Sequence, residues 1–134
     1  MAALTLEIVT PERRIATMQA EEVRAPGLVG GFAIRRDHTP FMSQLDPGRL
    51  TVVADGGERH FAIGGGFLQV ADNKVIVLAD SAEEREEIDV ERAERAFRES
   101  TERLRSLAAG DENYPLESTR VRRAAARLIV AGRR

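Results

Sequence analysis

Short apolar runs separated by polar turns dominate the first part of the chain. From Leu4 to Val9, apolar and polar side chains alternate with a period of two, the pattern of a half-buried β-strand. Val75-Ile76-Val77-Leu78 is typical of a short buried strand, and Asp46-Pro47-Gly48 and Asp55-Gly56-Gly57-Glu58 are typical of turns. Because the connections are too short for helical crossovers, these strands predict an antiparallel β-sandwich or barrel.

The pattern changes near residue 87. Between Asp89, a candidate N-cap, and Ala109 there is no Gly or Pro, and most residues favour a helix. Gly110 predicts the end of this helix, and Pro115 predicts the start of a second one that runs to about Ala131. Apolar or small side chains recur in the first helix at helical spacing, at Ala93, Ala96, Phe97, Ser100, Leu104 and Leu107.

These two patterns predict a β + α fold with two domains. An N-terminal antiparallel β-sandwich occupies residues 1–86, and a C-terminal two-helix antiparallel hairpin occupies residues 87–134. The apolar stripe of the hairpin is rich in alanine, which buries little area at about 25 cal/mol per Å². We therefore expect the hairpin to dock weakly on the sandwich and to be able to separate from it.

Charge is divided at the same boundary. Residues 1–86 have a net charge of −4, whereas residues 113–134 carry six arginines and a single acid, Glu117. The net charge of the whole chain, −2, argues against a nucleic-acid partner. A basic second helix is suited to an acidic protein surface or to a phosphate, although a solvated helix face is the more common explanation of such a pattern.

Three of the basic residues are expected to lie close together. Arg123 and Arg127 are four residues apart and share a helix face, and Arg92 lies near the start of the preceding helix. In an antiparallel hairpin the start of the first helix meets the end of the second, so the three converge near Asp89. Clusters of this kind bind phosphate groups through bidentate hydrogen bonds.

Few side chains suit catalysis. With no cysteine and two histidines, the composition excludes thiol catalysis and argues against a histidine-rich metal site. Asp37, His38 and Ser43 leave a small hydrolase as a rival hypothesis, although no Gly-x-Ser-x-Gly motif accompanies them. Gly64 to Gly66 precede a strand-like segment, so they predict a bulge or a close backbone approach and not a phosphate-binding loop. We expect no catalytic and no metal-binding residues.

Four segments carry a resemblance to a known family. They are HTPFMSQLDPG at 38–48, FAIGGGFLQV at 61–70, NKVIVLADSA at 73–82 and IDVERA at 88–93, followed by a helical hairpin of matching length. In this order and spacing, the chain resembles the epsilon subunit of bacterial F-type ATP synthases along essentially its whole length. The resemblance implies an N-terminal β-sandwich followed by a helix-turn-helix, in agreement with the patterns above.

The resemblance also implies a role. It predicts a non-catalytic subunit of the rotor, bound to the gamma subunit and the ring of c subunits below the alpha/beta catalytic head. Such a subunit couples rotation to ATP synthesis, inhibits ATP hydrolysis through its C-terminal helices, and lies peripherally at the cytoplasmic face of the bacterial inner membrane. A stand-alone interaction module, a β-sandwich with a helical arm for an unrelated partner, is the alternative.

Three sets of residues follow from the resemblance. Regulatory ATP, as some bacterial members bind it, is expected at Ile88, Asp89, Arg92, Ala93, Arg123 and Arg127. Docking on a catalytic beta subunit is expected at Arg120, Arg122, Arg123 and Arg127. The interface with gamma and the c-ring is expected at Leu28, Val29, Gly30, Gly31, His38, Phe41 and Met42.

The chain departs from the family pattern in two places. Family members commonly have Pro-Gly where this chain has Arg36-Asp37, which changes a loop expected to face partners. Nucleotide-binding members carry a further arginine at the position of Glu99, and a carboxylate there would repel a phosphate.

Overall fold

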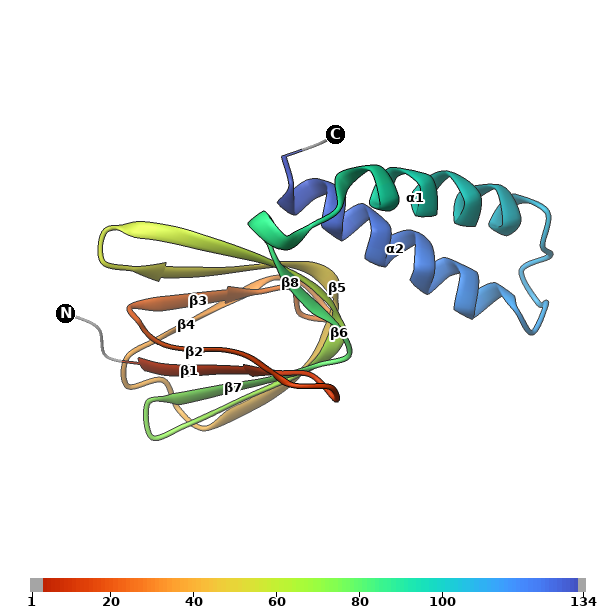
Figure 1. The fold of residues 1–134 in the computed structure, drawn as a ribbon. Coiled ribbons are helices and arrows are strands. Elements are labelled where there is room, and N and C mark those ends of the chain that lie inside the picture. Colours follow the sequence, from red (N-terminus) through yellow and green to blue (C-terminus); the bar gives the residue numbers. More distant parts are fainter. Residues whose placement is uncertain (1–3, 133–134) are drawn as a thin grey trace.

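A computed structural model describes residues 4–132 (Figure 1). Two arginines of the basic segment, Arg133 and Arg134, lie outside the described residues. The sandwich part consists of β1 (Leu4–Val9), β2 (Arg14–Ala20), β3 (Glu22–Ala25), β4 (Phe32–Arg35), β5 (Phe41–Ala54), β6 (Gly57–Ala71), β7 (Lys74–Ala79) and β8 (Ala82–Glu84). The C-terminal part consists of the 3-10 turn η1 (Arg85–Glu87), α1 (Val90–Arg105) and α2 (Tyr114–Val130).

One curled sheet forms both layers of the predicted sandwich. The strand order is β2-β1-β7-β6-β5-β3-β4, and β8 pairs with the first part of β6. Neighbouring strands are antiparallel except β1 and β7, which pair in parallel. The predicted fold class, a β-sandwich followed by a two-helix hairpin, is confirmed.

The turn residues act as predicted at one of the two proposed turns. Asp55 and Gly56 have φ values of 51° and 75°, as a two-residue type I′ turn requires, and they join β5 to β6. The expected turn at Asp46-Pro47-Gly48 is wrong, because β5 continues through it and Pro47 lies opposite Gly64. There the long strand passes from one layer to the other: its second half pairs with β3, while the Asp46 N–H binds the carbonyl of Pro26.

The three glycines lie inside β6 where other segments approach closely. A Cβ atom at Gly66 would lie 2.1 Å from the carbonyl oxygen of Leu78, and φ at Gly66 is +135°. The register with β5 is the same on both sides of the glycines, and on the other edge of β6 the partner changes from β8 before the glycines to β7 after them. The interpretation as a close backbone approach is therefore confirmed, and the strand that follows rules out a phosphate loop.

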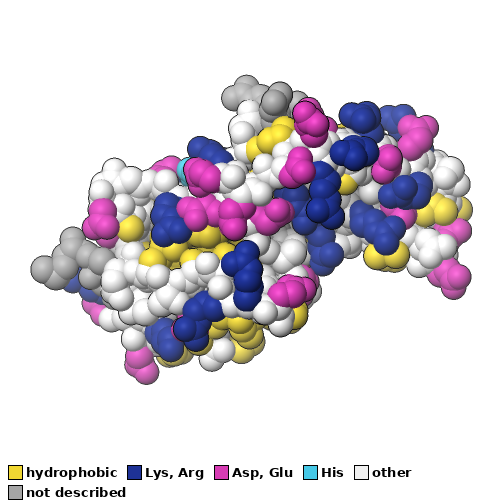
Figure 2. Space-filling view, in the orientation of Figure 1, with side chains coloured by type: hydrophobic (Ala, Val, Ile, Leu, Met, Phe, Trp, Pro, Cys, Tyr) yellow, Lys and Arg dark blue, Asp and Glu magenta, His cyan; other side chains and the backbone are white. Residues whose placement is uncertain are grey.

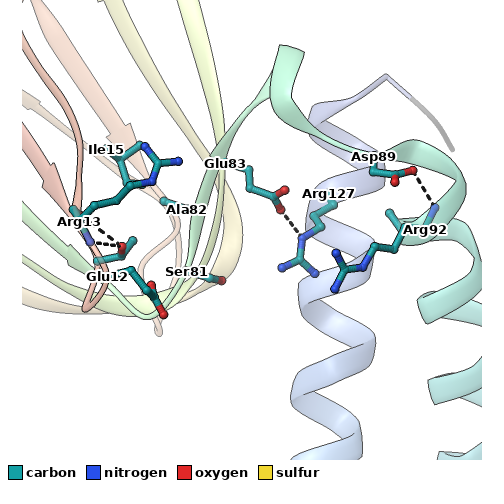
Figure 3. A pocket seen from close by; sticks show the side chains of 11 residues that line it. Glu12, Arg13, Ile15, Ser81, Ala82, Glu83, Asp89, Arg92 and Arg127 are labelled. Atoms are coloured by element: carbon teal, nitrogen blue, oxygen red, sulfur yellow. Dashed lines mark hydrogen bonds and ion pairs between the residues drawn. The ribbon is translucent and has the colours of Figure 1, made fainter.

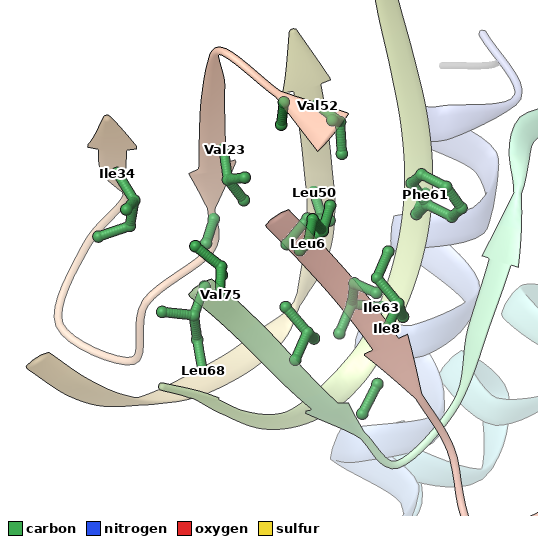
Figure 4. Packing of buried hydrophobic residues seen from close by; sticks show 14 of the residues in the cluster. Leu6, Ile8, Val23, Ile34, Leu50, Val52, Phe61, Ile63, Leu68 and Val75 are labelled. Carbon is green, nitrogen blue, oxygen red and sulfur yellow. The ribbon is translucent and has the colours of Figure 1, made fainter. Parts of the chain in front are cut away.

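The core of the sandwich is filled by large aliphatic side chains and Phe61 (Figure 4). Leu4, Leu6 and Ile8 are fully buried and alternate with half-buried neighbours, as the period of two predicts. The prediction that all of residues 75–78 are buried is wrong. Val75 and Val77 point into the core, but Leu78 is 51% exposed, because successive side chains of a strand face opposite sides.

The helical hairpin begins as predicted and its first helix ends early. The side chain of Asp89 accepts the backbone N–H of Arg92 at 3.1 Å, which confirms it as the N-cap of α1. The expected end at Gly110 is wrong: α1 ends at Arg105, where the Ser106 hydroxyl binds the carbonyl of Arg103 at 2.8 Å. The second helix contains Pro115 in its first turn, as expected.

Contact between the two parts is narrow. In Figure 1 the hairpin projects from one end of the sandwich, and α2 contacts β5 and β6 as well as α1. The buried apolar side chains at this junction are Ala62 from β6, Ile88 and Val130, with Val90 and Ala131 partly buried beside them. Arg85 adds a hydrogen bond of 2.6 Å to the carbonyl of Val130 at the end of α2.

Candidate functional site

A cavity of about 340 Å³ lies between the sandwich and the start of the hairpin (Figure 3). One wall comes from the β1–β2 connection with Glu12 and Arg13, and Glu83 of β8 forms part of another. The helical wall consists of Asp89, Arg92, Ala93 and Arg127.

Four of the six residues predicted to bind a nucleotide line this cavity. Asp89, Arg92, Ala93 and Arg127 do so, as the antiparallel arrangement of the helices predicts. Ile88 instead packs with Ala62 and Val130. Arg123 does not line this cavity: its Nε donates to the carbonyl of Gly64, 2.8 Å away, because residue 123 lies one helical turn before Arg127. For Arg123, the expected convergence near Asp89 is wrong.

Charges in the cavity are balanced. The lining acids Glu12, Glu83 and Asp89 face three arginines, Arg13, Arg92 and Arg127. The Nε of Arg127 donates to Oε1 of Glu83 at 2.5 Å, and Arg13 lies 3.6 Å from Glu87.

Arg92 forms no ion pair with any residue in 4–132, and Figure 3 shows its side chain next to that of Arg127. An anion in the cavity would meet Arg92 directly and would have to displace Glu83 from Arg127. Glu99 is exposed and does not line the cavity, so it lies away from any phosphate bound there.

All four arginines predicted to dock on a beta subunit have partners within the chain. Arg120 pairs with Glu117 on the same helix at 2.7 Å. The other three bind the sandwich: Arg122 contacts Asp46 at 2.6 Å, and Arg123 and Arg127 bind as given above. In Figure 2, lysine and arginine side chains gather next to acidic ones where the hairpin meets the sandwich.

A buried carboxylate that sequence reasoning missed joins the two helices. Glu117 of α2 is 6% exposed and accepts from Arg103 of α1 at 3.2 Å, and Arg103 also donates to the hydroxyl of Ser100 at 3.3 Å. Burial raises the pKa of Glu117, but hydrogen bonds from Arg103 and Arg120 outweigh it, so the pKa is lowered. The available signal in the sequence was that Glu117 is the single acidic residue in the basic segment 113–134.

Six of the seven residues predicted to contact gamma and the c-ring are exposed, and the seventh, His38, is half-buried. Leu28, Val29 and Met42 are large apolar side chains in solvent, and Met42 is 64% exposed. Gly30 and Gly31 are exposed in the same loop. Phe41 faces the other side of β5, where its ring packs edge-on against Phe32 and His38, with centroids 5.3 and 5.5 Å apart.

Two further apolar side chains extend this surface and were not predicted from the sequence. Phe67 of β6 is 49% exposed and lies directly opposite Leu78 of β7 and Gln44 of β5. Since Met42 and Gln44 are two residues apart on β5, Met42 shares the same face. Strict alternation from Val75 and Val77 would have placed Leu78 outside. Hereafter, Leu28, Val29, Met42, Phe67 and Leu78 are called the outer apolar patch.

The loop that departs from the family pattern has a defined conformation. Asp37 has a φ of 63°, a region that glycine adopts easily and that aspartate tolerates. Its backbone N–H donates to Oδ1 of Asn73 at 2.7 Å, and the Asn73 amide donates back to the Asp37 carboxylate at 3.3 Å. Asp37 thus takes a conformation available to glycine and is tied to the β6–β7 turn.

Nothing in the described residues assembles the rival hydrolase. The Ser43 hydroxyl binds the carbonyl of Gln44, the His38 ring nitrogen lies 2.7 Å from the carbonyl of Thr39, and no hydrogen bond links Asp37, His38 and Ser43. No group of three His, Asp or Glu side chains placed to hold a metal occurs in residues 4–132. Within the same residues, neither helix is long and apolar enough to span a membrane.

Comparison with known proteins agrees with the fold. Residues 3–85 match the family model of the ATP synthase delta/epsilon chain β-sandwich domain, and residues 86–132 match that of its long α-helix domain. The chain is 63% identical over 131 residues to the ATP synthase epsilon chain of Anaeromyxobacter sp. (strain Fw109-5), covering 98% of this chain and 99% of the relative. The epsilon chain of Myxococcus xanthus is 47% identical, with 98% and 96% covered.

A solved structure has the same fold. A chain in the cryo-EM structure of Euglena gracilis mitochondrial ATP synthase, OSCP/F1/c-ring, superposes with a TM-score of 0.81 at 24% identity. The match covers 98% of this chain and 82% of that one. With both family models matched over nearly the full length, this chain belongs to the ATP synthase epsilon chain family.

Proposed function

We propose that the chain is a non-catalytic rotor subunit of the central stalk, with a sandwich that couples rotation and a hairpin that inhibits ATP hydrolysis. One combination of features supports this proposal. The sandwich has a continuous buried core and an exposed apolar patch, whereas the hairpin is basic and is held by narrow contacts. Its place is the cytoplasmic face of the bacterial inner membrane, reached through the complex.

The outer apolar patch is the proposed site for gamma and the c-ring. Exposed apolar side chains that cluster on one face of a soluble domain typically mark an interface. Here Met42, Phe67 and Leu78 lie on three adjacent strands, so they form one apolar surface on the sheet. The neighbouring loop contributes Leu28 and Val29, and the backbone N–H of Leu28 is held by the carbonyl of Gln44.

The hairpin is the proposed inhibitory element. Arg120, Arg122, Arg123 and Arg127 lie on α2, and freed from their internal partners they would suit an acidic surface on a catalytic beta subunit. Such docking requires the hairpin to leave the sandwich. The apolar contact to be broken is small, which keeps the free energy of separation modest.

Truncation after Glu87 tests both halves of the proposal. The truncated chain keeps every strand and η1 and loses both helices. In the assembled complex, we expect truncation to raise ATP hydrolysis while the truncated chain still binds gamma. Unchanged hydrolysis would contradict the inhibitory role of the hairpin, and failure of both chains to bind gamma would contradict the rotor role.

Regulatory binding of ATP is a second proposed function, favoured by the cavity. Arg92 and Arg127 would hold the phosphates, and Asp89 would accept hydrogen bonds from the sugar or base. Because both sandwich and hairpin line the cavity, a ligand there would bind only the folded hairpin and shift the population toward it.

Calorimetric titration of the full chain with ATP tests this binding. We expect Arg92→Gln to weaken binding about tenfold or more, since a charge-assisted hydrogen bond would be lost. Arg98→Gln is a matched control, because Arg98 lies on α1 but not in the cavity. Equal loss in both variants, or no heat with the unmodified chain, would contradict a nucleotide site here.

The stand-alone interaction module remains the alternative proposal. It would use the same outer apolar patch for an unrelated partner. Capture experiments that recover gamma with the full chain, and lose it with Phe67→Ala, would argue against the alternative.

A further inference from the structure

Three arginines of α2 hold the hairpin against the sandwich. Arg122 contacts Asp46 at 2.6 Å, and Arg127 contacts Glu83 at 2.5 Å. Between them, Arg123 donates from Nε to the carbonyl oxygen of Gly64 at 2.8 Å, and its Nη2 lies 3.6 Å from Asp80. These side chains are one-third to one-half exposed, so they are accessible to water and to a competing partner.

Their partners come from separate segments of the sandwich. Asp46 lies in β5, Gly64 in β6, Asp80 between β7 and β8, and Glu83 in β8. The strand register brings these segments together, since the Gly64 N–H binds the carbonyl of Ser81 and the Asp80 N–H binds that of Gly65. The sandwich therefore presents three carboxylates and the carbonyl of Gly64 to α2.

Gly64 leaves room for the side chain of Arg123. A Cβ atom at residue 64 would lie 3.0 Å from Nε of Arg123 and 2.0 Å from Oγ of Ser81. Because Gly64 has no side chain, the guanidinium group can approach the strand and use its carbonyl. A hydrogen bond from a charged donor is stronger than one between neutral groups.

We propose that these contacts form a latch, the arginine latch, which stores the hairpin on the sandwich and sequesters the guanidinium groups that an acidic partner would need. It consists of Arg122, Arg123 and Arg127 with Asp46, Gly64, Asp80 and Glu83. The latch rests on the proposed function only for the identity of that partner, the catalytic head.

The latch makes two states of the hairpin mutually exclusive. A guanidinium bound to a sandwich carboxylate cannot at the same time bind a carboxylate of another subunit. The partner therefore shifts the population toward the open hairpin only to the extent that it binds the open form more tightly than the closed form. These charged contacts add to the small apolar contact at the junction in holding the hairpin. Ion pairs exposed to solvent are screened by salt, so salt favours opening.

Neutralising the sandwich side of the latch tests the proposal without changing the hairpin. The latch variant combines Asp46→Asn, Asp80→Asn and Glu83→Gln. The control variant removes the same charge from exposed acids that form no ion pair in the described residues, by Glu21→Gln, Asp55→Asn and Asp72→Asn.

Opening is measured as energy transfer between two dyes on the full, free chain. The chain has no cysteine, so Lys74→Cys on β7 and Ala108→Cys in the helix connection give two unique labelling sites. We expect the ratio of open to closed hairpin to rise about tenfold in the latch variant, because three half-exposed pairs are lost. The control should stay within about twofold of the unmodified chain.

A substitution at Gly64 tests the central contact of the latch, between Arg123 and the carbonyl of Gly64. In a Ser81→Ala background, which removes the hydroxyl nearest to the new atom, Gly64→Ala should push Arg123 off the carbonyl and open the hairpin. Hydrogen exchange of the β6 amides reports whether the sandwich itself stays folded. Opening with unchanged exchange in β6 supports the latch.

Hydrolysis by the assembled complex separates the latch from the proposed function. The latch variant keeps its arginines and should inhibit more strongly, whereas Arg122→Gln, Arg123→Gln and Arg127→Gln combined should open the hairpin and inhibit less. Opening in both variants without any change in hydrolysis would keep the latch and overturn the inhibitory role. No opening in the latch variant, or equal opening in the control variant, would overturn the latch whatever the hydrolysis rate.

Discussion

The sandwich and the hairpin are stabilised in different ways. The sandwich buries a continuous core of leucine, isoleucine, valine and phenylalanine between the layers of one curled sheet. The hairpin meets it through a small apolar cluster, in which Ala62 of the sandwich contacts Ile88 and Val130, and through a set of arginine contacts. Apolar side chains buried in the core cannot exchange their contacts for contacts with another protein. An arginine, in contrast, can exchange a carboxylate of the sandwich for a carboxylate of another subunit. The proposed function uses both kinds of contact, because in it the sandwich transmits force and the hairpin changes its position.

The largest expected effect is a difference in unfolding free energy between alanine variants of two phenylalanines on β6. Phe61 is fully buried, so Phe61→Ala should reduce the unfolding free energy by about 3–5 kcal/mol. Phe67 is half exposed, so Phe67→Ala should change it by less than about 1 kcal/mol and weaken binding to gamma instead. Urea unfolding measures the first effect and pull-down of gamma the second. Equal destabilisation by both variants would refute the division between core and outer apolar patch.

A smaller effect is expected at the junction. Val130 is fully buried against Ala62 and Ile88, so Val130→Ala should weaken docking of the hairpin by about 2 kcal/mol. Hydrogen exchange should accelerate in α2 and remain unchanged in β6. The neighbouring Ile129 is 54% exposed, and Ile129→Ala serves as the matched control. Faster exchange in the β6 core with Val130→Ala would mean that the two parts unfold as one unit.

The start of α1 should respond to the loss of its cap. Asp89→Ala removes the acceptor for the Arg92 N–H and should cost about 1 kcal/mol of helix stability, whereas Asp89→Asn should retain most of it. Helix content measured by circular dichroism should fall for the alanine variant alone. If asparagine lowers it equally, the carboxylate charge and not the cap is responsible.

The smallest expected effect is that of pH on stability between pH 7 and pH 5. It depends on two separate buried carboxylates, one in the sandwich and one in the hairpin. Glu22 of the sandwich is bound by Arg35 and Arg24, and hydrogen bonds from these two lower its pKa. Burial alone raises the pKa of Glu117 in the hairpin, but Arg103 and Arg120 bring it below the usual value. A carboxyl with a lowered folded-state pKa contributes stability above the unfolded value, about 4.3, and loses it as the pH falls through the folded value.

Both regions should therefore keep their stability down to about pH 5 and lose it in more acidic solution. Unfolding measured against pH should show a weaker acid dependence for the sandwich with Glu22→Gln. The hairpin should show the same change with Glu117→Gln. A stability that rises as the pH falls from 5 to 3 would contradict the lowered pKa values.

Patterns in the sequence determined the elements and their order. Alternation placed Leu4, Leu6 and Ile8 in the core, Asp55-Gly56 closed a hairpin, and Asp89 began a helix, because each depends on neighbours in the chain. The resemblance added the family, which the comparisons bear out.

What only the tertiary structure decided depends on residues distant in the chain. The continuation of β5 through Pro47 requires the glycines of β6 opposite it. Arg123 binds Gly64 and not the cavity because the docking angle of α2, set by side chains 40 to 80 residues away, fixes which arginine faces which wall. The exposure of Phe67 and Leu78 likewise depends on which face of the curled sheet encloses the core, and alternation alone does not choose that face where both faces of a strand carry apolar side chains.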